Sequence, residues 1–272
     1  MAEIINMFSY HFIQRAFAVG ILVSLCAALL GVSLVLKRFS MIGDGLSHVG
    51  FGALAVSAAL GLAPLAVAVP TVIAAAILLL RINQNGKWSG DSAVAMISSG
   101  ALALGVISMT LAGGMNTELS AYMFGSILSL SRSDAVLSVI LSAMVLLVFI
   151  LLYPRIFAVT FDETFAKATG TQTELYNTVI AVLTAVTVVL GMRMMGALLI
   201  SSLIIFPALS AMRICRSFKA VVVCSAVISV LCFIAGASAS YFLELPTGAS
   251  IVVAELVVFG LSCLANYLHK AE

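Results

Sequence analysis

Long apolar segments, separated by short polar connections, make up most of this chain. Nine such segments cover residues 11–36, 43–61, 63–82, 91–113, 134–153, 176–195, 196–213, 218–242 and 249–268. Most are close to the roughly 20 apolar residues that an α-helix needs to cross a bilayer. The sixth and seventh segments run together through Met192–Gly196. The pattern therefore predicts an all-α, polytopic transmembrane helical bundle with eight or nine spans.

The composition supports this class and excludes others. Hydrophobic residues make up 63% of the 272 residues, charged residues make up 9%, and the mean hydropathy is +1.23. A soluble domain has about 45–50% apolar and about 25% charged residues, and a membrane β-barrel shows alternating rather than continuous apolar positions. The formal net charge of +2 is too small to indicate nucleic acid as a partner. We expect a single transmembrane domain over residues 1–272, surrounded by membrane lipid.

Basic residues are distributed unevenly between the two sets of connections. If the first segment runs from outside to inside and all nine cross, ten basic residues fall on one side and three on the other. Because cytoplasmic loops carry the excess of Lys and Arg, the side with ten is predicted to be cytoplasmic, with the N-terminus outside and the C-terminus inside. The ten are Lys37, Arg38, Arg81, Lys87, Arg155, Lys167, Arg213, Arg216, Lys219 and Lys270, and the three are Arg15, Arg132 and Arg193.

The longest predicted cytoplasmic connection, at about 155–174, has the spacing of an amphipathic helix. Phe157, Phe161 and Phe165 recur on one face. Asp162 is among the polar residues between them, and Gly170 follows as a C-cap. A helix that lies on the lipid headgroups would explain the pattern. A docking surface for a cytosolic partner explains it better, because so short a helix has no role in crossing the membrane.

Ionisable residues within apolar segments point to function, since a charge near the bilayer centre costs about 2.5–3.5 kcal/mol on insertion scales. The leading case is GDGLSHVGFG at 43–52, where Asp44 and His48 share one helix face. A carboxylate and an imidazole one turn apart can bind a divalent ion of the zinc, manganese or iron type. Alternatively, Asp44 caps the helix and His48 bonds a carbonyl group, and spacing alone favours neither explanation. The glycines of this stretch would let another backbone approach closely.

Two further ionisable residues lie in or between apolar segments. Glu255 is either satisfied by a hydroxyl or Arg partner, which is the simpler explanation, or a third metal ligand. Arg193 is either a gate residue near the outer face or an interface anchor. Gly86–Lys87 is not part of a nucleotide-binding loop, because Arg81 and Trp88 occupy positions that require Gly and Ser or Thr. We therefore expect no catalytic residues and no permanently bound cofactor, and any ATP hydrolysis requires a separate chain.

The stretch LVLKRFSMIGDGLSHVGFGALA (34–55) resembles the signature of the membrane subunits of ABC importers for zinc, manganese and iron. In that family a basic pair precedes a G-D-x-x-S/A-H helix. Further stretches are similar to other segments of the family, in the expected order over nearly the whole chain. They are ELSAYMFGSILSLS (118–131) in the outer loop, FDETFAKATG (161–170) in the cytoplasmic coupling helix, GMRMMGALLISSLIIFPALSA (191–211), and PTGASIVV (246–253) at the start of the last helix.

The resemblance implies a permease of the type II ABC importer architecture in the bacterial cytoplasmic (inner) membrane. The implied partners are a second permease copy in a homodimer, a cytoplasmic ABC ATPase dimer and an extracytoplasmic metal-binding protein. It also implies that Asp44 and His48 are metal ligands in the translocation path, and that Arg193 lies near the outer gate. The residues implied to couple the permease to the ATPase are Phe161, Asp162, Phe165, Ala166 and Gly170.

The transported substrate implied by the resemblance is a divalent transition metal. Zinc is favoured over manganese or iron, because YHFIQRAF (10–17) and MFGSI (123–127) look like zinc-type members. One tension remains, since Asp44 lies only a turn or two from the Lys37–Arg38 pair, whereas transporters usually bind substrate near the midplane. Two rival classes are an ATP-independent metal transporter or channel, which would not need the 161–170 helix, and a membrane scaffold, which would not need Asp44 and His48.

Overall fold

The computed structural model describes residues 10–84, 90–112, 123, 125, 131–197 and 199–271. All regular structure in these residues is helical. The helices are α2 (His11–Leu36), α3 (Met41–Ala59), α4 (Pro64–Gln84), α5 (Gly90–Leu111), α7 (Arg132–Phe161), α8 (Glu163–Ala168), α9 (Thr173–Met195), α10 (Ile200–Ile214), α11 (Phe218–Leu243) and α12 (Thr247–Ala271).

Each of the nine apolar segments corresponds to one long helix, so the expected all-α bundle is confirmed. The two segments that merge in the sequence are separated by a turn at Gly196 (φ +90°) and form α9 and α10. Seven of the described helices are long and apolar enough to cross a membrane, and α10 is a shorter apolar helix of 15 residues. α3 is not among the seven, because Asp44 and His48 lower its hydropathy.

The segment at 155–174 differs from its prediction. α7 continues past residue 153 to Phe161, because Pro154 removes only one backbone hydrogen bond from a 30-residue helix. The helix ends at Asp162, whose extended backbone (φ −147°, ψ 96°) redirects the chain into α8. The single amphipathic helix that the phenylalanine spacing predicts is therefore divided between the last turns of α7 and the six-residue α8.

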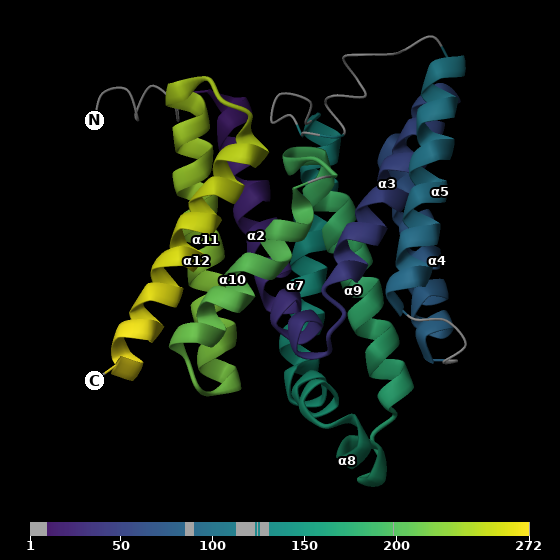
Figure 1. Cartoon of the computed structure of the whole chain (residues 1–272). Coiled ribbons are helices and arrows are strands. Elements are labelled where there is room, and N and C mark those ends of the chain that lie inside the picture. The colour runs from purple at the N-terminus through teal and green to yellow at the C-terminus, as the bar shows by residue number, and fades with distance from the viewer. Residues whose placement is uncertain are drawn as a thin grey trace.

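α3, which carries Asp44 and His48, lies inside the bundle, and large apolar side chains of other helices face outward. In Figure 1, α11 and α12 form one flank and α4 and α5 the other, with α2, α7 and α9 between them. α3 packs against α4, α5, α9 and α10. α5 and α12 expose large apolar side chains, among them Leu104, Ile107, Leu256 and Leu261. This is the arrangement that a lipid environment requires, because lipid cannot satisfy polar groups.

Successive long helices run in opposite directions, so their connections gather at two ends of the bundle (Figure 1). The α2–α3 corner, α8 and the end of α12 lie at the lower end of that view, and α2 and α7 begin at the upper end. The predicted sorting of basic residues follows this division. Among the described residues, Lys37, Arg38, Arg81, Arg155, Lys167, Arg213, Arg216 and Lys219 belong to the lower end, and Arg15, Arg132 and Arg193 to the upper end.

Candidate metal site

Asp44 and His48 lie one turn apart on the same face of α3, with Asp44 in the first turn. His48 Nε2 lies 3.7 Å from Asp44 Oδ2. The other carboxylate oxygen, Asp44 Oδ1, accepts a 3.1 Å hydrogen bond from Ser201 Oγ in the first turn of α10. The positive end of the α10 dipole also favours a carboxylate here. Asp44 does not cap α3, because the N-cap residue is Ser40.

The spacing within this Asp44–His48 pair suits a shared metal ion. A separation of 3.7 Å is too long for a hydrogen bond. Two ligand atoms bound at about 2.1 Å in a tetrahedral shell would lie about 3.4 Å apart. Among the described residues, no group of three or more His, Cys, Asp or Glu side chains could hold a metal. The described part of the chain therefore brings together two candidate ligands, and any metal ion there would need further ligands from elsewhere.

Glycines allow the neighbouring helix to approach α3 closely. A Cβ atom at Gly52 would lie 2.5 Å from the carbonyl oxygen of Ala101 in α5, and one at Gly45 would lie 2.5 Å from Cγ1 of Val94. The contact at Gly52 is with backbone, which cannot move aside as a side chain can. The close backbone approach predicted for this glycine-rich stretch is thus present, and it packs α3 tightly against α5.

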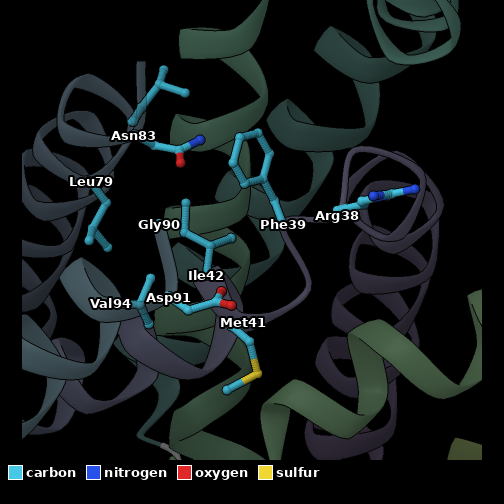
Figure 2. A pocket seen from close by; sticks show the side chains of 10 residues that line it. Arg38, Phe39, Met41, Ile42, Leu79, Asn83, Gly90, Asp91 and Val94 are labelled. Carbon is cyan, nitrogen blue, oxygen red and sulfur yellow. The ribbon is translucent and has the colours of Figure 1, made fainter. Parts of the chain in front are cut away.

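A cavity of about 150 Å³ lies beside the beginning of α3, and Figure 2 shows the side chains that line it. It is lined by Ile42 of α3, by Asn83 near the end of α4 and by Asp91 at the start of α5. Ile42 precedes Asp44 by two residues. An opening with polar side chains therefore lies beside the first turn of α3, close to Asp44 and toward the end of the bundle where α8 lies.

Glu255 lies apart from the Asp44–His48 pair, in α12. Its side chain is 1% exposed, and neither carboxylate oxygen has a hydrogen-bond partner among the described residues. The hydroxyl or arginine partner that the sequence led us to expect is not found there. The structure also does not bring Glu255 together with Asp44 and His48 into a group that could hold a metal, within the residues it describes.

Arg193 joins two helices at the end of the bundle opposite α8. In the last turn of α9, its Nη2 donates to Oδ2 of Asp134 at 3.0 Å, and Asp134 lies in the first turn of α7. The Arg193 side chain is only 9% exposed. This geometry makes Arg193 an interhelical contact between α7 and α9, and a role at an outer gate stays a prediction.

Capping interactions define the α8 segment, residues 161–170. Asp162 Oδ1 accepts a 2.9 Å hydrogen bond from the backbone N–H of Phe165, which caps α8. After the helix, Gly170 has φ +82°, a conformation that disfavours any residue with a Cβ atom. Its N–H donates to Lys167 O (3.1 Å), and the N–H of residue 171 donates to Ala166 O (3.0 Å), which together form a Schellman motif. Gly170 therefore ends the segment, in agreement with the sequence.

The α8 segment presents aromatic side chains to its surroundings. Phe161 is 73% exposed and Phe165 is 65% exposed, whereas Ala166 is 1% exposed and anchors the segment to the bundle. The segment projects from the lower end of the bundle in Figure 1. Large exposed aromatic residues at a protruding helix are typical of a surface that another protein covers.

Two polar contacts in this region have no counterpart in the sequence analysis. One is Ser201 with Asp44, 157 residues apart, and the other is Lys37 with Glu163, 126 residues apart. A serine within an apolar run or a lysine at a helix end carries no local signal of such a partner. Only the packing of α2, α8 and α10 brings these side chains together.

Comparison with known proteins places the whole bundle in one family. Residues 9–266 match the ABC 3 transport family. The chain is 30% identical over 253 residues to the high-affinity zinc uptake system membrane protein ZnuB of Haemophilus influenzae, covering 93% of this chain and 97% of that protein. It is 27% identical over 257 residues to the manganese transport system membrane protein MntC of Halalkalibacterium halodurans, covering 94% of this chain and 88% of that protein.

A solved structure supports the same assignment. The chain is similar to a chain of PsaBC from Streptococcus pneumoniae in complex with Fab, with a TM-score of 0.86, 30% sequence identity, and coverage of 96% of this chain and 94% of that one. The family match extends over every described helix except the last residues of α12. The protein is therefore a multi-pass protein of the inner membrane, and it belongs to the ABC 3 transport family.

Proposed function

We propose that the chain is the permease subunit of an ATP-driven importer for a divalent transition metal, with zinc as the substrate. Family membership and relatives named for zinc and manganese transport support the general function. The protein itself has no enzymatic role in this proposal, because a separate ATPase chain hydrolyses ATP. The substrate ion occupies the site only in passing, so it is cargo and not a resident cofactor.

The Asp44–His48 pair is the observation that carries this proposal. A metal ion arriving without its water shell needs replacement ligands, and a carboxylate and a neutral imidazole supply them. The ion in turn offsets the cost of placing a carboxylate within the bundle. Side chains that are 37% (Asp44) and 17% (His48) exposed leave the pair open to water, which suits a site that must release its ion.

The choice of zinc as the ion comes from a resemblance of two stretches and not from the ligand set. One nitrogen and one oxygen ligand are compatible with zinc, manganese and iron, and affinity order alone does not select among them. We favour zinc because the stretches at 10–17 and 123–127 resemble zinc-type members. Manganese and iron are the alternatives within the same mechanism.

We assign one proposed partner protein to each end of the bundle. The exposed Phe161 and Phe165 of the α8 segment would dock on a cytoplasmic ABC ATPase, with Asp162 and Gly170 fixing the ends of the segment. An extracytoplasmic metal-binding protein would deliver the ion at the opposite end. A second permease copy would complete a homodimer. Alternating access then requires two states whose balance the ATPase shifts through the α8 segment.

Metal content of cells tests the proposal. The chain would be expressed with its ATPase and binding protein in a bacterium lacking its own zinc and manganese importers, and metals would be measured by elemental mass spectrometry. We expect zinc to accumulate with the wild type and not with Asp44→Asn or His48→Ala. His11→Ala and Glu174→Gln serve as matched controls, since both residues are exposed and lie outside the site.

The outcomes separate the alternatives. Accumulation of manganese instead of zinc would keep the mechanism and change the substrate. Accumulation that is unaffected by either site substitution would remove Asp44 and His48 from the path. Metal uptake that persists without the ATPase would favour an ATP-independent transporter, and absence of any uptake would favour a membrane scaffold.

A further inference from the structure

The side chain of Lys37, at the end of α2, reaches acceptors from three other helices. Its Nζ lies 3.0 Å from Glu163 Oε2 at the start of α8, and 3.2 Å from the backbone oxygen of Val159 in the last turn of α7. The third acceptor is Oδ1 of Asn177 in α9. Asn177 Nδ2 also donates to Glu163 Oε1 at 2.9 Å. Lys37, Glu163 and Asn177 therefore form a closed ring, called here the Lys37 node.

Most of the Lys37 node is shielded from water. The Lys37 side chain is 8% exposed and Asn177 is 6% exposed. An ammonium group has three donors, and three acceptors are present here. A shielded ammonium group is stable only when it is paired and hydrogen-bonded. The node is thus shielded at Lys37 and Asn177, whereas the Glu163 side chain is 46% exposed and open to water on one side.

The Lys37 node links α8 to the end of α2. The backbone of α8 packs chiefly against α7 and α9. The contact between the end of α2 and α8 is made by the long side chain of Lys37, whose Nζ reaches Glu163. A displacement of α8 relative to the bundle therefore acts on α2 through Lys37.

Lys37 is also the first residue of the corner that connects α2 to α3. The corner covers only residues 37–40, and Arg38 within it adopts the left-handed conformation (φ +60°). α3 then begins at Met41, and Asp44 lies in its first turn. A corner this short, with one residue already in a sparsely populated conformation, has little freedom to absorb movement. Movement of Lys37 is passed on to the start of α3.

We propose that Lys37 is a positioning residue for transport, which carries movement of the α8 segment to α3 and so to the Asp44–His48 pair. This inference rests on the proposed function, because it requires an ATPase on α8 and a metal ion at the pair. Lys37 belongs neither to the pair nor to the exposed aromatic surface. A residue that only stabilised the fold would affect yield and unfolding temperature, whereas a residue that transmits movement affects the metal transported per ATP hydrolysed.

The test uses the permease co-purified with its ATPase and reconstituted in liposomes, with the binding protein loaded with Zn²⁺ or Mn²⁺. Lys37→Met keeps the side-chain length and removes the three donors. Glu163→Gln keeps the shape and removes the charge at a side chain that is 46% exposed, so folding is not at risk. Lys219→Met is the control, because Lys219 is an exposed lysine in the first turn of α11 at the same end of the bundle. The readouts are metal uptake per ATP, ATPase rate and metal Kd.

We expect Lys37→Met to assemble, to bind metal with the wild-type Kd and to transport about tenfold less metal per ATP. Glu163→Gln should change in the same direction by less, and Lys219→Met should not change. Wild-type uptake per ATP in both node variants would overturn the inference. If Lys37→Met fails to assemble, Glu163→Gln decides alone. ATP-driven uptake that fails in the wild type would instead overturn the proposed function.

Discussion

Replacing Ser201 by alanine tests whether the structure orients the Asp44 carboxylate for a metal ion. Ser201 Oγ donates to Asp44 Oδ1 at 3.1 Å, which leaves Oδ2 on the side of His48 Nε2. Ser201→Ala removes this hydrogen bond and leaves the charge of the site unchanged. It does not destabilise α10, because alanine has a higher helix propensity than serine. We expect weaker metal binding with an unchanged fold.

The expected magnitude follows from the exposure of the acceptor. A hydrogen bond to a charged group contributes about 1.5–3 kcal/mol. The Asp44 side chain is 37% exposed, so water replaces part of the lost bond and the lower end of this range applies. About 1.4 kcal/mol corresponds to a tenfold change in Kd, and loss of an outer-shell partner of a metal ligand usually weakens binding by about 10–100-fold. We therefore expect the metal Kd to rise about tenfold.

Titration calorimetry of the purified permease with Zn²⁺, and separately with Mn²⁺, measures this change. Ser202→Ala is the matched control, because Ser202 is the adjacent residue and its hydroxyl donates to the carbonyl oxygen of Leu199 in the same turn. An equal Kd for the two serine variants would refute the orienting role of Ser201. Thermal unfolding of both variants at one scan rate confirms that the fold is intact.

Three further changes test the surface and the packing. Phe165→Asp places a charge on a side chain that is 65% exposed, so we expect normal folding but reduced metal-stimulated ATPase activity in the assembled complex; intact activity would contradict docking on α8. Gly52→Val forces a side chain against the α5 backbone, 2.5 Å from the ideal Cβ position. Overpacking costs about 1–3 kcal/mol, so the unfolding temperature in detergent should fall, whereas Gly100→Ala, which meets nothing within 4 Å, should leave it unchanged. Arg193→Met removes one partner of the 3.0 Å ion pair with Asp134. Breaking a buried pair costs about 3–5 kcal/mol, so a double-mutant cycle with Asp134→Asn should give a clear coupling energy. A coupling energy near zero would show that the pair does not stabilise the α7–α9 contact.

The sequence predicted the helices well because the signal for a membrane helix is local. Each apolar segment became a helix, and its two ends were marked by charges and turn residues nearby. The errors have local causes too. Pro154 suggests an end to α7, yet a helix that loses one hydrogen bond in 30 residues continues to Phe161. The count of eight or nine spans was left open rather than wrong, because the backbone conformation at Gly196 decides whether the merged segments form one helix or two.

The candidate site was predictable only where its residues share a helix. Asp44 and His48 are one turn apart, so helical periodicity alone places them together. Ser201 reaches Asp44 across 157 residues, and no pattern in one sequence connects them. The same limit applies to Glu255, for which a polar partner was expected. Whether a buried acid meets a hydroxyl depends on the rotation of α12 against its neighbours, which hydropathy does not encode.

The burial of α3 has a consequence for how the protein is made. A helix that carries Asp44 and His48 enters a bilayer less readily than a wholly apolar helix, because polar and charged side chains oppose insertion, more so the nearer they lie to the helix centre. The hydroxyl that satisfies this carboxylate belongs to Ser201, which is synthesised 157 residues later. At about 5–20 residues per second, the ribosome leaves Asp44 without that partner for about 8–30 s. During this interval α3 depends on its immediate neighbours in the chain, so substitutions that weaken its packing on α4 and α5 should reduce the amount of protein that reaches the membrane correctly inserted.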